Sequence, residues 1–176
     1  TSLLREQGWQ AICGDIDEVA LAKCAERNPG CRCVTLTMGD DRVPVDDAAV
    51  DLVLCIEVPG VLESAWFREE LVRVLKPGGL VVGVFHNRNS ARGLLRAVRD
   101  KQRGQYCFYQ MGFSNWSSLM RSGGLDIVYA EGLCWFPFGR MSDSALIPPC
   151  IGLERFLGLR ALPSLSPWVA FVAVNS

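Results

Sequence analysis

Apolar segments that read as strands alternate with amphipathic segments that read as helices along most of this 176-residue chain. Two of the strand segments, 50–56 and 80–85, are almost entirely apolar, which is typical of parallel strands buried on both faces. A helix between them is indicated by four apolar residues spaced i, i+4, i+7 and i+8: Phe67, Leu71, Val74 and Leu75. The alternation predicts an α/β, Rossmann-like fold with a mostly parallel sheet, helices on both faces and right-handed crossovers.

The same reasoning places the other elements on one domain spanning residues 1–176. Gly8 ends a first helix, Asp17 caps a second helix, and Ser90 caps a later one. Five of the nine prolines lie between the last two strands, so 134–166 is expected to be a mostly irregular insertion. The remaining predicted segments are strands at 9–14, 33–38, 125–131 and 168–174, the last two as an antiparallel hairpin, and helices at 17–28, 90–103, 114–121 and 151–159.

Charge and hydropathy exclude several classes of protein. Eighteen basic residues against nineteen acidic ones give no overall positive field, so a dedicated nucleic-acid binder is not expected. The longest apolar runs fall far short of the about 20 residues that a membrane span requires. Residues 1–8 contain Arg5 and Glu6 and no apolar leader segment, and the expected location is therefore the cytoplasm.

Eight cysteines raise the alternative of a disulfide framework or a metal site. However, the only close pair is Cys31-x-Cys33, and His86 is the only histidine. Several cysteines stand inside apolar runs, as Cys55 does, where a thiol behaves as a small apolar side chain. Reduced thiols and no metal are therefore expected.

Acidic and polar residues follow four successive strands, at the edge where ligands bind in parallel sheets. Asp15 follows the first predicted strand, Asp40 the second, Glu57 the third and His86 the fourth. One carboxylate there can accept hydrogen bonds from both hydroxyls of a ribose. A second carboxylate, after the neighbouring strand, can accept a hydrogen bond from an exocyclic amine. The alternative reading is that the aspartates are helix caps and turn residues. We favour the nucleoside reading because Asp15 and Asp40 occupy matched places.

Several short motifs, in this order, resemble the class I, Rossmann-like S-adenosylmethionine-dependent methyltransferases. They are Gly-Asp-Ile-Asp (14–17), Met-Gly-Asp (38–40), Val-Pro-Val-Asp-Asp-Ala-Ala-Val-Asp-Leu-Val (43–53) and Arg-Val-Leu-Lys-Pro-Gly-Gly (73–79). The resemblance covers residues 1 to about 89, and its most specific part is Leu-Lys-Pro-Gly-Gly before an apolar strand. It implies binding of S-adenosylmethionine or S-adenosylhomocysteine and transfer of a methyl group.

The resemblance also implies roles for individual residues. Asp15 matches the acid that holds the ribose diol, and Ile16 matches its neighbour that packs on the adenine. Asp40 matches the acid that faces the adenine amino group, and Asp41 the residue whose backbone N–H lies near the ring. Residues 55–57, which are Cys55, Ile56 and Glu57, match the stretch that lines the methionine end of the cofactor and the mouth of the substrate site.

One feature of the family is missing from this sequence. The family's first strand and its Gly-rich loop should precede the helix that contains Leu3 and Leu4. That strand lies between the second and fourth strands, so its removal would leave two interior strand edges without partners. The expectation is an N-terminally incomplete domain that, by itself, binds the cofactor poorly.

A methyl group on a sulfonium needs mainly an acceptor held in line, and a base only if the acceptor must lose a proton. His86 and Glu57 are the candidate bases by position. The aromatic cluster of 135–138 before the insertion favours a small lipophilic acceptor. The alternatives are a non-catalytic methyltransferase-like module and a nicotinamide-dependent oxidoreductase, because a shared fold does not fix the function.

An arginine series on the helix after Ser90 has two readings. Arg92, Arg96, Arg99 and Arg103 recur at helical spacing. They form either a solvated helix face or a patch for an anionic substrate or partner.

Overall fold

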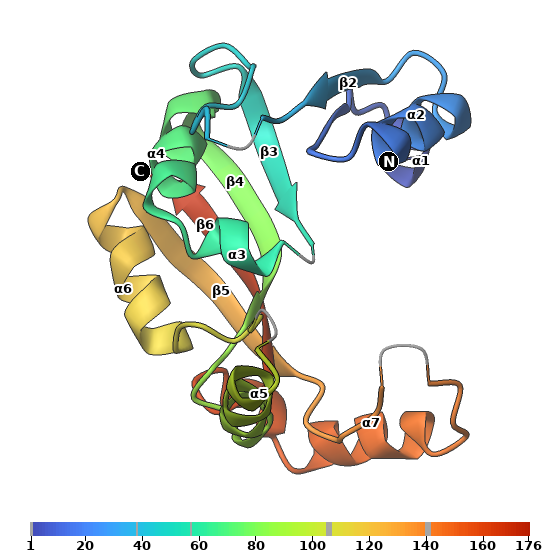
Figure 1. Cartoon of the computed structure of the whole chain (residues 1–176), viewed down its shortest axis with the longest axis vertical. Coiled ribbons are helices and arrows are strands. Elements are labelled where there is room, and N and C mark those ends of the chain that lie inside the picture. Colours follow the sequence, from blue (N-terminus) through green and yellow to red (C-terminus); the bar gives the residue numbers. More distant parts are fainter. Residues whose placement is uncertain (1, 38, 57, 105–106, 140–141) are drawn as a thin grey trace. The chain divides into compact units, whose positions relative to one another are not determined.

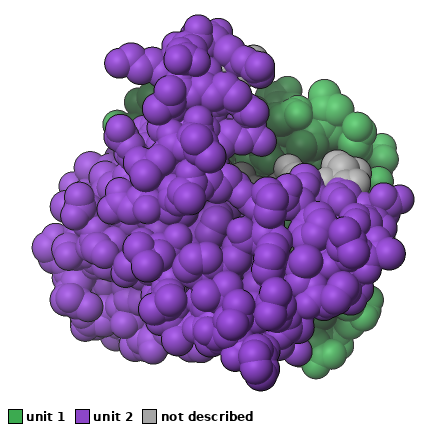
Figure 2. Space-filling model, turned by 90° about the horizontal axis from the view of Figure 1, so that it is seen from below, with its two compact units in different colours: residues 1–46 green, residues 47–176 purple. Residues whose placement is uncertain are grey.

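The computed structural model describes residues 2–37, 39–56, 58–104, 107–139 and 142–176. Its contacts divide the chain into two compact units, residues 1–46 and residues 47–176, which Figure 2 shows in different colours. Each unit has its own sheet. The prediction of one domain over 1–176 stays a prediction.

Unit 1 contains two short helices and a two-stranded parallel sheet. Its elements are α1 (Ser2–Glu6), β1 (Ile12–Asp15), α2 (Glu18–Arg27) and β2 (Arg32–Thr35). β1 pairs in parallel with β2, with Asp15 opposite Thr35. The cap predicted for α2 is confirmed, because the Asp17 side chain accepts from the backbone N–H groups of Val19 and Ala20 at 2.8 and 3.3 Å.

Unit 2 is built on a four-stranded mixed sheet in the order β3–β4–β6–β5 (Figure 1). Its strands are β3 (Val50–Cys55), β4 (Leu75–His86), β5 (Leu125–Leu133) and β6 (Trp168–Asn175). β3 and β4 are parallel, whereas β6 runs antiparallel to both β4 and β5. The carboxyl ends of β3 and β4 therefore lie at one edge, together with the first residue of β6, since His86 is opposite Trp168.

Helical segments complete the described part of unit 2. They are α3 (Pro59–Leu62), α4 (Ala65–Val74), α5 (Ala91–Gln102), α6 (Phe113–Ser122), α7 (Ile147–Phe156) and the 3₁₀ turn η1 (Leu159–Ala161). The Ser90 cap of α5 is confirmed, because the Ser90 hydroxyl accepts from the N–H of Gly93 at 2.9 Å. None of the described helices combines the length and the apolar composition that a bilayer span requires.

Aromatic side chains from β4, α6 and β6 form the centre of the unit 2 core. The Phe85 ring stacks on Trp116 with 4.6 Å between ring centroids, and Phe171 meets Trp116 edge-on at the same distance. The Trp116 Nε1–H donates to the carbonyl of Leu62 at 2.8 Å. The indole is thus buried without an unsatisfied donor, and it links α6 to the end of α3.

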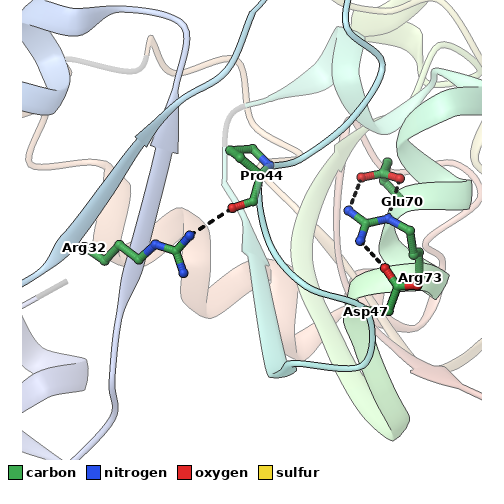
Figure 3. Close-up of polar contacts among 5 residues, drawn as sticks. All are labelled: Arg32, Pro44, Asp47, Glu70 and Arg73. Carbon is green, nitrogen blue, oxygen red and sulfur yellow. Dashed lines mark hydrogen bonds and ion pairs between the residues drawn. The ribbon is translucent and has the colours of Figure 1, made fainter.

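Arginine side chains fix the segments near the boundary of the two units, each within its own unit (Figure 3). In unit 1, Arg32 donates to the carbonyl of Pro44 at 3.1 Å. In unit 2, Arg73 on α4 pairs with Asp47 at 2.5 Å and with Glu70 at 2.6 Å. The carboxylates of Glu70 and Asp47 raise the pKa of Arg73 above its usual value. The ion pair between Arg73 and Asp47 holds the first residue of unit 2 against α4.

The fold class predicted from the sequence is confirmed, with parallel strand pairs and an antiparallel pairing of the last two strands. Element bounds differ in several places. The first strand begins at Ile12 rather than Trp9, because the Trp9 N–H donates back to Leu4 at the end of α1. β4 begins at Leu75 rather than Leu80 and so includes Lys76-Pro77-Gly78-Gly79. α7 begins at Ile147 rather than at residue 151, because Pro148 and Pro149 fit a first helical turn.

Candidate functional site

Asp15 lies where the sequence predicts it, as the last residue of β1 and exposed to solvent. Its Oδ1 accepts from the N–H of Asp17 at 3.0 Å, so the side chain helps to shape the turn into α2. The Leu36 N–H donates to the Asp15 carbonyl at 2.9 Å. The carboxylate therefore stands at the carboxyl edge of the unit 1 sheet, and the chain leaving β2 passes beside its backbone.

Asp40 and Asp41 lie in the segment after β2, which ends at Thr35, and both are exposed. The Asp40 N–H donates to the Thr37 carbonyl at 3.3 Å, which closes a turn. Asp41 has a φ of +45°, a conformation that aspartate tolerates better than most residues. Met38 lies outside the described residues.

Ile16 has 60% of its surface exposed, directly after Asp15. An exposed isoleucine beside a carboxylate provides an apolar face and a hydrogen-bond acceptor at one place. This combination suits a nucleoside, whose base is flat and apolar on its faces and whose sugar carries hydroxyl donors.

In unit 2, the residues after β3 are only partly available to a ligand. The Cys55 side chain is 2% exposed, and burial raises the pKa of its thiol to about 12. The thiol therefore stays neutral, and only the backbone of Cys55 reaches the strand end. Ile56 is 63% exposed, and Glu57 lies outside the described residues.

His86 ends β4 with its ring enclosed by aromatic side chains. Tyr109 meets the ring edge-on at 5.5 Å between centroids, and Trp168 does so at 5.1 Å. The Trp168 Nε1–H in turn donates to the Tyr109 hydroxyl at 3.0 Å. The imidazole, 9% exposed, is thus held at the edge by residues from β6 and from the segment before α6.

Asn87, the next residue, was not singled out by the sequence analysis. Its side chain is fully buried, and its Nδ2 donates to the carbonyls of Ser164 and Ser166 at 2.9 and 3.0 Å. Its Oδ1 accepts from the backbone N–H groups of Asn89 and Phe113 at 3.1 and 3.0 Å. This one side chain therefore fixes the loop after β4 to the start of α6 and to the segment before β6.

Glu63 is a second group that the sequence analysis missed. Its Oε1 accepts from the Met111 N–H at 3.1 Å, while its Oε2 is buried and accepts no hydrogen bond from the described residues. Burial raises the pKa of this carboxyl to about 7, against the lowering effect of backbone N–H donors. A carboxyl that exchanges a proton near neutral pH has the property of a general base, and no sequence pattern distinguishes it.

A shallow hollow of about 350 Å³ lies in the part of unit 2 that contains Tyr109. Tyr109, which contacts His86, is also one of its lining residues. The lining residues are Arg88, Ala97, Cys107, Tyr109 and Gln110. The hollow has room for a small molecule next to the end of β4.

The aromatic cluster of the sequence, 135–138, has its backbone held from two helices. Glu154 on α7, 5% exposed, accepts from the N–H groups of Trp135 and Phe136 at 2.9 and 3.4 Å. Arg92 on α5 donates to the Phe136 carbonyl. The first arginine of the α5 series is therefore bound to the chain itself rather than simply solvated.

Residues 1–83 match the family model described as a methyltransferase domain. No curated protein is significantly similar to the chain. Among solved structures, an S-adenosylmethionine-dependent methyltransferase from Mesorhizobium loti is 16% identical, with a TM-score of 0.68 over 98% of this chain and 84% of that one. The chain therefore has the class I methyltransferase fold, and the resemblance found in the sequence is confirmed at this level.

Two further structures share the fold at 16% identity. One is a complex from Haloferax volcanii that contains the Trm112 methyltransferase activator, with a TM-score of 0.64 over 99% of this chain and 76% of that one. The other is the [4+2]-cyclase SpnF, with a TM-score of 0.62 over 99% and 70%. One fold thus carries more than one kind of chemistry.

Proposed function

Because the chain has this fold, we propose that it is part of an S-adenosylmethionine-dependent methyltransferase that acts on a small-molecule acceptor. The observation that carries the proposal is the placing of Asp15 and Asp40 after the carboxyl ends of neighbouring parallel strands, with Ile16 exposed beside Asp15. In such sheets, ligands bind outside this edge.

Each unit has its own role in this proposal. In unit 1, Asp15 accepts hydrogen bonds from the ribose hydroxyls, Ile16 packs on the adenine, and Asp40 and Asp41 face its polar edge. In unit 2, Cys55 and Ile56 match the stretch that the family uses for the methionine end of the cofactor. In this proposal the acceptor binds near the ends of β3 and β4, and the hollow lined by Tyr109 is a candidate space for it.

The cofactor supplies a methyl group on a positively charged sulfur, so the carbon is already activated. The protein's task is to hold the acceptor atom in line with the carbon–sulfur bond and to exclude water. Where the acceptor must lose a proton, His86, Glu57 and Glu63 are the candidate bases. Of these, Glu63 combines burial with a pKa of about 7.

Binding of S-adenosylhomocysteine to the protein tests the proposal. A ligand that binds only the native state raises the unfolding midpoint. We expect S-adenosylhomocysteine to raise the midpoint of the wild type. For Asp15→Asn we expect a smaller rise, corresponding to a Kd at least about tenfold weaker, or about 1.4 kcal/mol of binding free energy. Glu26→Gln, which removes an exposed charge from α2 in the same unit, is the matched control.

The outcomes separate the alternatives. A midpoint raised by NADH and not by S-adenosylhomocysteine would favour a nicotinamide-dependent oxidoreductase. No response to either nucleotide would favour a non-catalytic module. Equal binding by the wild type and Asp15→Asn would show that the carboxylate does not hold the nucleoside.

A further inference from the structure

Unit 1 gathers cysteines that are far apart in the sequence. Cys13 lies on β1, Cys24 on α2 and Cys31 in the turn before β2. The Sγ atoms of Cys13 and Cys24 are 3.2 Å apart, and those of Cys13 and Cys31 are 3.5 Å apart. All three ligand atoms lie within 4.8 Å of one another, and all three residues are partly buried.

We propose that Cys13, Cys24 and Cys31 form a binding site for one thiophilic d¹⁰ cation, with zinc as the expected occupant. Three cysteine Sγ atoms from three separate segments converge on one point, and cysteine sulfur is a ligand type that zinc prefers in structural sites. The proposal concerns residues outside the sites described above and does not depend on the proposed function.

The sulfur spacing suits a cation of this size. Zinc–sulfur bonds of about 2.3 Å in tetrahedral geometry set the sulfurs about 3.8 Å apart. The observed separations of 3.2 and 3.5 Å need to open by a few tenths of an ångström. The fourth position is left to water or to a further ligand.

The surroundings of the cluster keep its side chains in place. The Asn28 Nδ2–H donates to the Cys24 carbonyl at 3.0 Å, and Asn28 itself is 8% exposed at the end of α2. The Cys31 thiol donates to the Ala11 carbonyl at 3.2 Å, just before β1. The two contacts hold α2 and the start of β1 around the thiols, which is the role of the outer shell in a metal site.

Unit 1 also has little apolar core of its own. Among its described residues, Leu21 and Asn28 are the buried ones. Units of this size often depend on a metal or disulfides for stability. A cation held by β1, α2 and the turn before β2 would join all three segments and would contribute binding energy directly to folding.

Burial, followed by the neighbouring thiol of Cys13, raises the pKa of Cys31 to about 11. Without a cation the Cys31 thiol therefore stays protonated at neutral pH. A bound cation reverses this preference and releases protons, as thiolate coordination requires.

Zinc titration of the reduced full chain tests the proposal. We expect one zinc ion per chain by native mass spectrometry, and visible absorption bands of thiolate-bound cobalt when Co(II) replaces zinc. Cys13→Ser, Cys24→Ser and Cys31→Ser should each weaken zinc binding more than about 100-fold, because loss of a ligand exceeds loss of an outer-shell partner. Cys107→Ser and Cys150→Ser, at partly buried thiols in unit 2, are the matched controls.

A second measurement needs no variant and so does not depend on how the variants fold. Zinc should protect Cys13, Cys24 and Cys31 from alkylation, mapped by peptide mass spectrometry, and leave the alkylation of Cys107 and Cys150 unchanged. Zinc binding that is unaffected by the three substitutions, or protection spread over all cysteines, would overturn the proposal. So would a Cys13–Cys24 disulfide found in non-reducing peptide maps of the protein without stoichiometric metal.

Discussion

Single side chains at the end of β4 show how burial changes the importance of a residue. Asn87 is fully buried and bonds to groups on both sides of the loop, whereas Asn89, two residues later, is exposed. The two residues have the same chemistry. The difference lies in the number of backbone groups that would lose a partner on truncation.

Truncation of Asn87 is therefore expected to be costly. Asn87→Ala leaves the carbonyls of Ser164 and Ser166 and the Phe113 N–H without this partner, and we expect a loss of about 3 kcal/mol or more in the free energy of unfolding. Asn89→Ala should change it by less than about 0.5 kcal/mol. Urea unfolding monitored by tryptophan fluorescence measures both, and equal losses would contradict the role assigned to Asn87.

Glu63 gives the protein a pH dependence with a definite sign. Its pKa is raised from 4.5 to about 7, so the folded state prefers the protonated form. The contribution of this carboxyl to the free energy of unfolding is fully present below pH 4.5 and is lost as the pH rises through about 7. The wild type should therefore lose stability relative to Glu63→Gln over this window, because glutamine cannot ionise. The glutamine side chain can still accept a hydrogen bond from the Met111 N–H.

Urea unfolding at intervals from pH 4.5 to 8 measures this difference. Glu69→Gln, at an exposed position on α4, should track the wild type at every pH. A constant difference between wild type and Glu63→Gln across the range would show that the carboxyl is ionised throughout.

Among the elements, β4 has the least room for change. It pairs with β3 on one side and with β6 on the other. A Cβ added at Gly83 would lie 2.6 Å from the Cys55 carbonyl oxygen and 2.9 Å from the Phe171 ring. The close approach of backbone and ring thus requires glycine at this point of the strand.

Two glycine-to-alanine substitutions should have opposite effects. Gly83→Ala forces the backbone of β3 or the Phe171 ring to move, and we expect a loss of about 2–3 kcal/mol. Gly152→Ala meets nothing within 4 Å and lies inside α7, so we expect a gain of about 0.5–1 kcal/mol. Thermal unfolding followed by circular dichroism compares the two, and a shift of the same sign would contradict the packing described for β4.

At the scale of the whole molecule, the apolar core is concentrated in unit 2. Among the described residues, Leu21 is the one buried apolar side chain in unit 1. The other buried apolar side chains lie in unit 2, many of them on β4, α6 and β6. Local stability follows buried contacts, so the two units should differ in their protection from solvent.

Hydrogen exchange measures this difference in the reduced protein. We expect the amides of β4 and β6 to exchange slowest, and those of β1 and β2 much faster. If the cysteines of unit 1 bind zinc, added zinc should slow exchange in β1, α2 and β2 and leave β4 and β6 unchanged. Equal protection of the two sheets without zinc would contradict the concentration of stability in unit 2.

Local physical chemistry is what the sequence could predict for this protein. Asp17 and Ser90 cap helices because their side chains reach N–H groups two or three residues away. The apolar residues of α4 lie on one face, and Phe67, Leu71 and Val74 are buried as that spacing predicts. The strands before Asp15 and Asp40 could be found in the same way, whereas the ends of strands depend on pairing and were less well predicted.

Contacts between distant segments were decided only by the tertiary structure. Cys13, Cys24 and Cys31 form no spacing that a metal motif would show, and they meet because β1, α2 and β2 fold around one point. Asn87 becomes a central side chain only when residues 163–166 and α6 are brought to it. Periodicity and capping act over a few residues and can be read in a line of sequence. Burial and convergence depend on distances that exist only once the chain has folded.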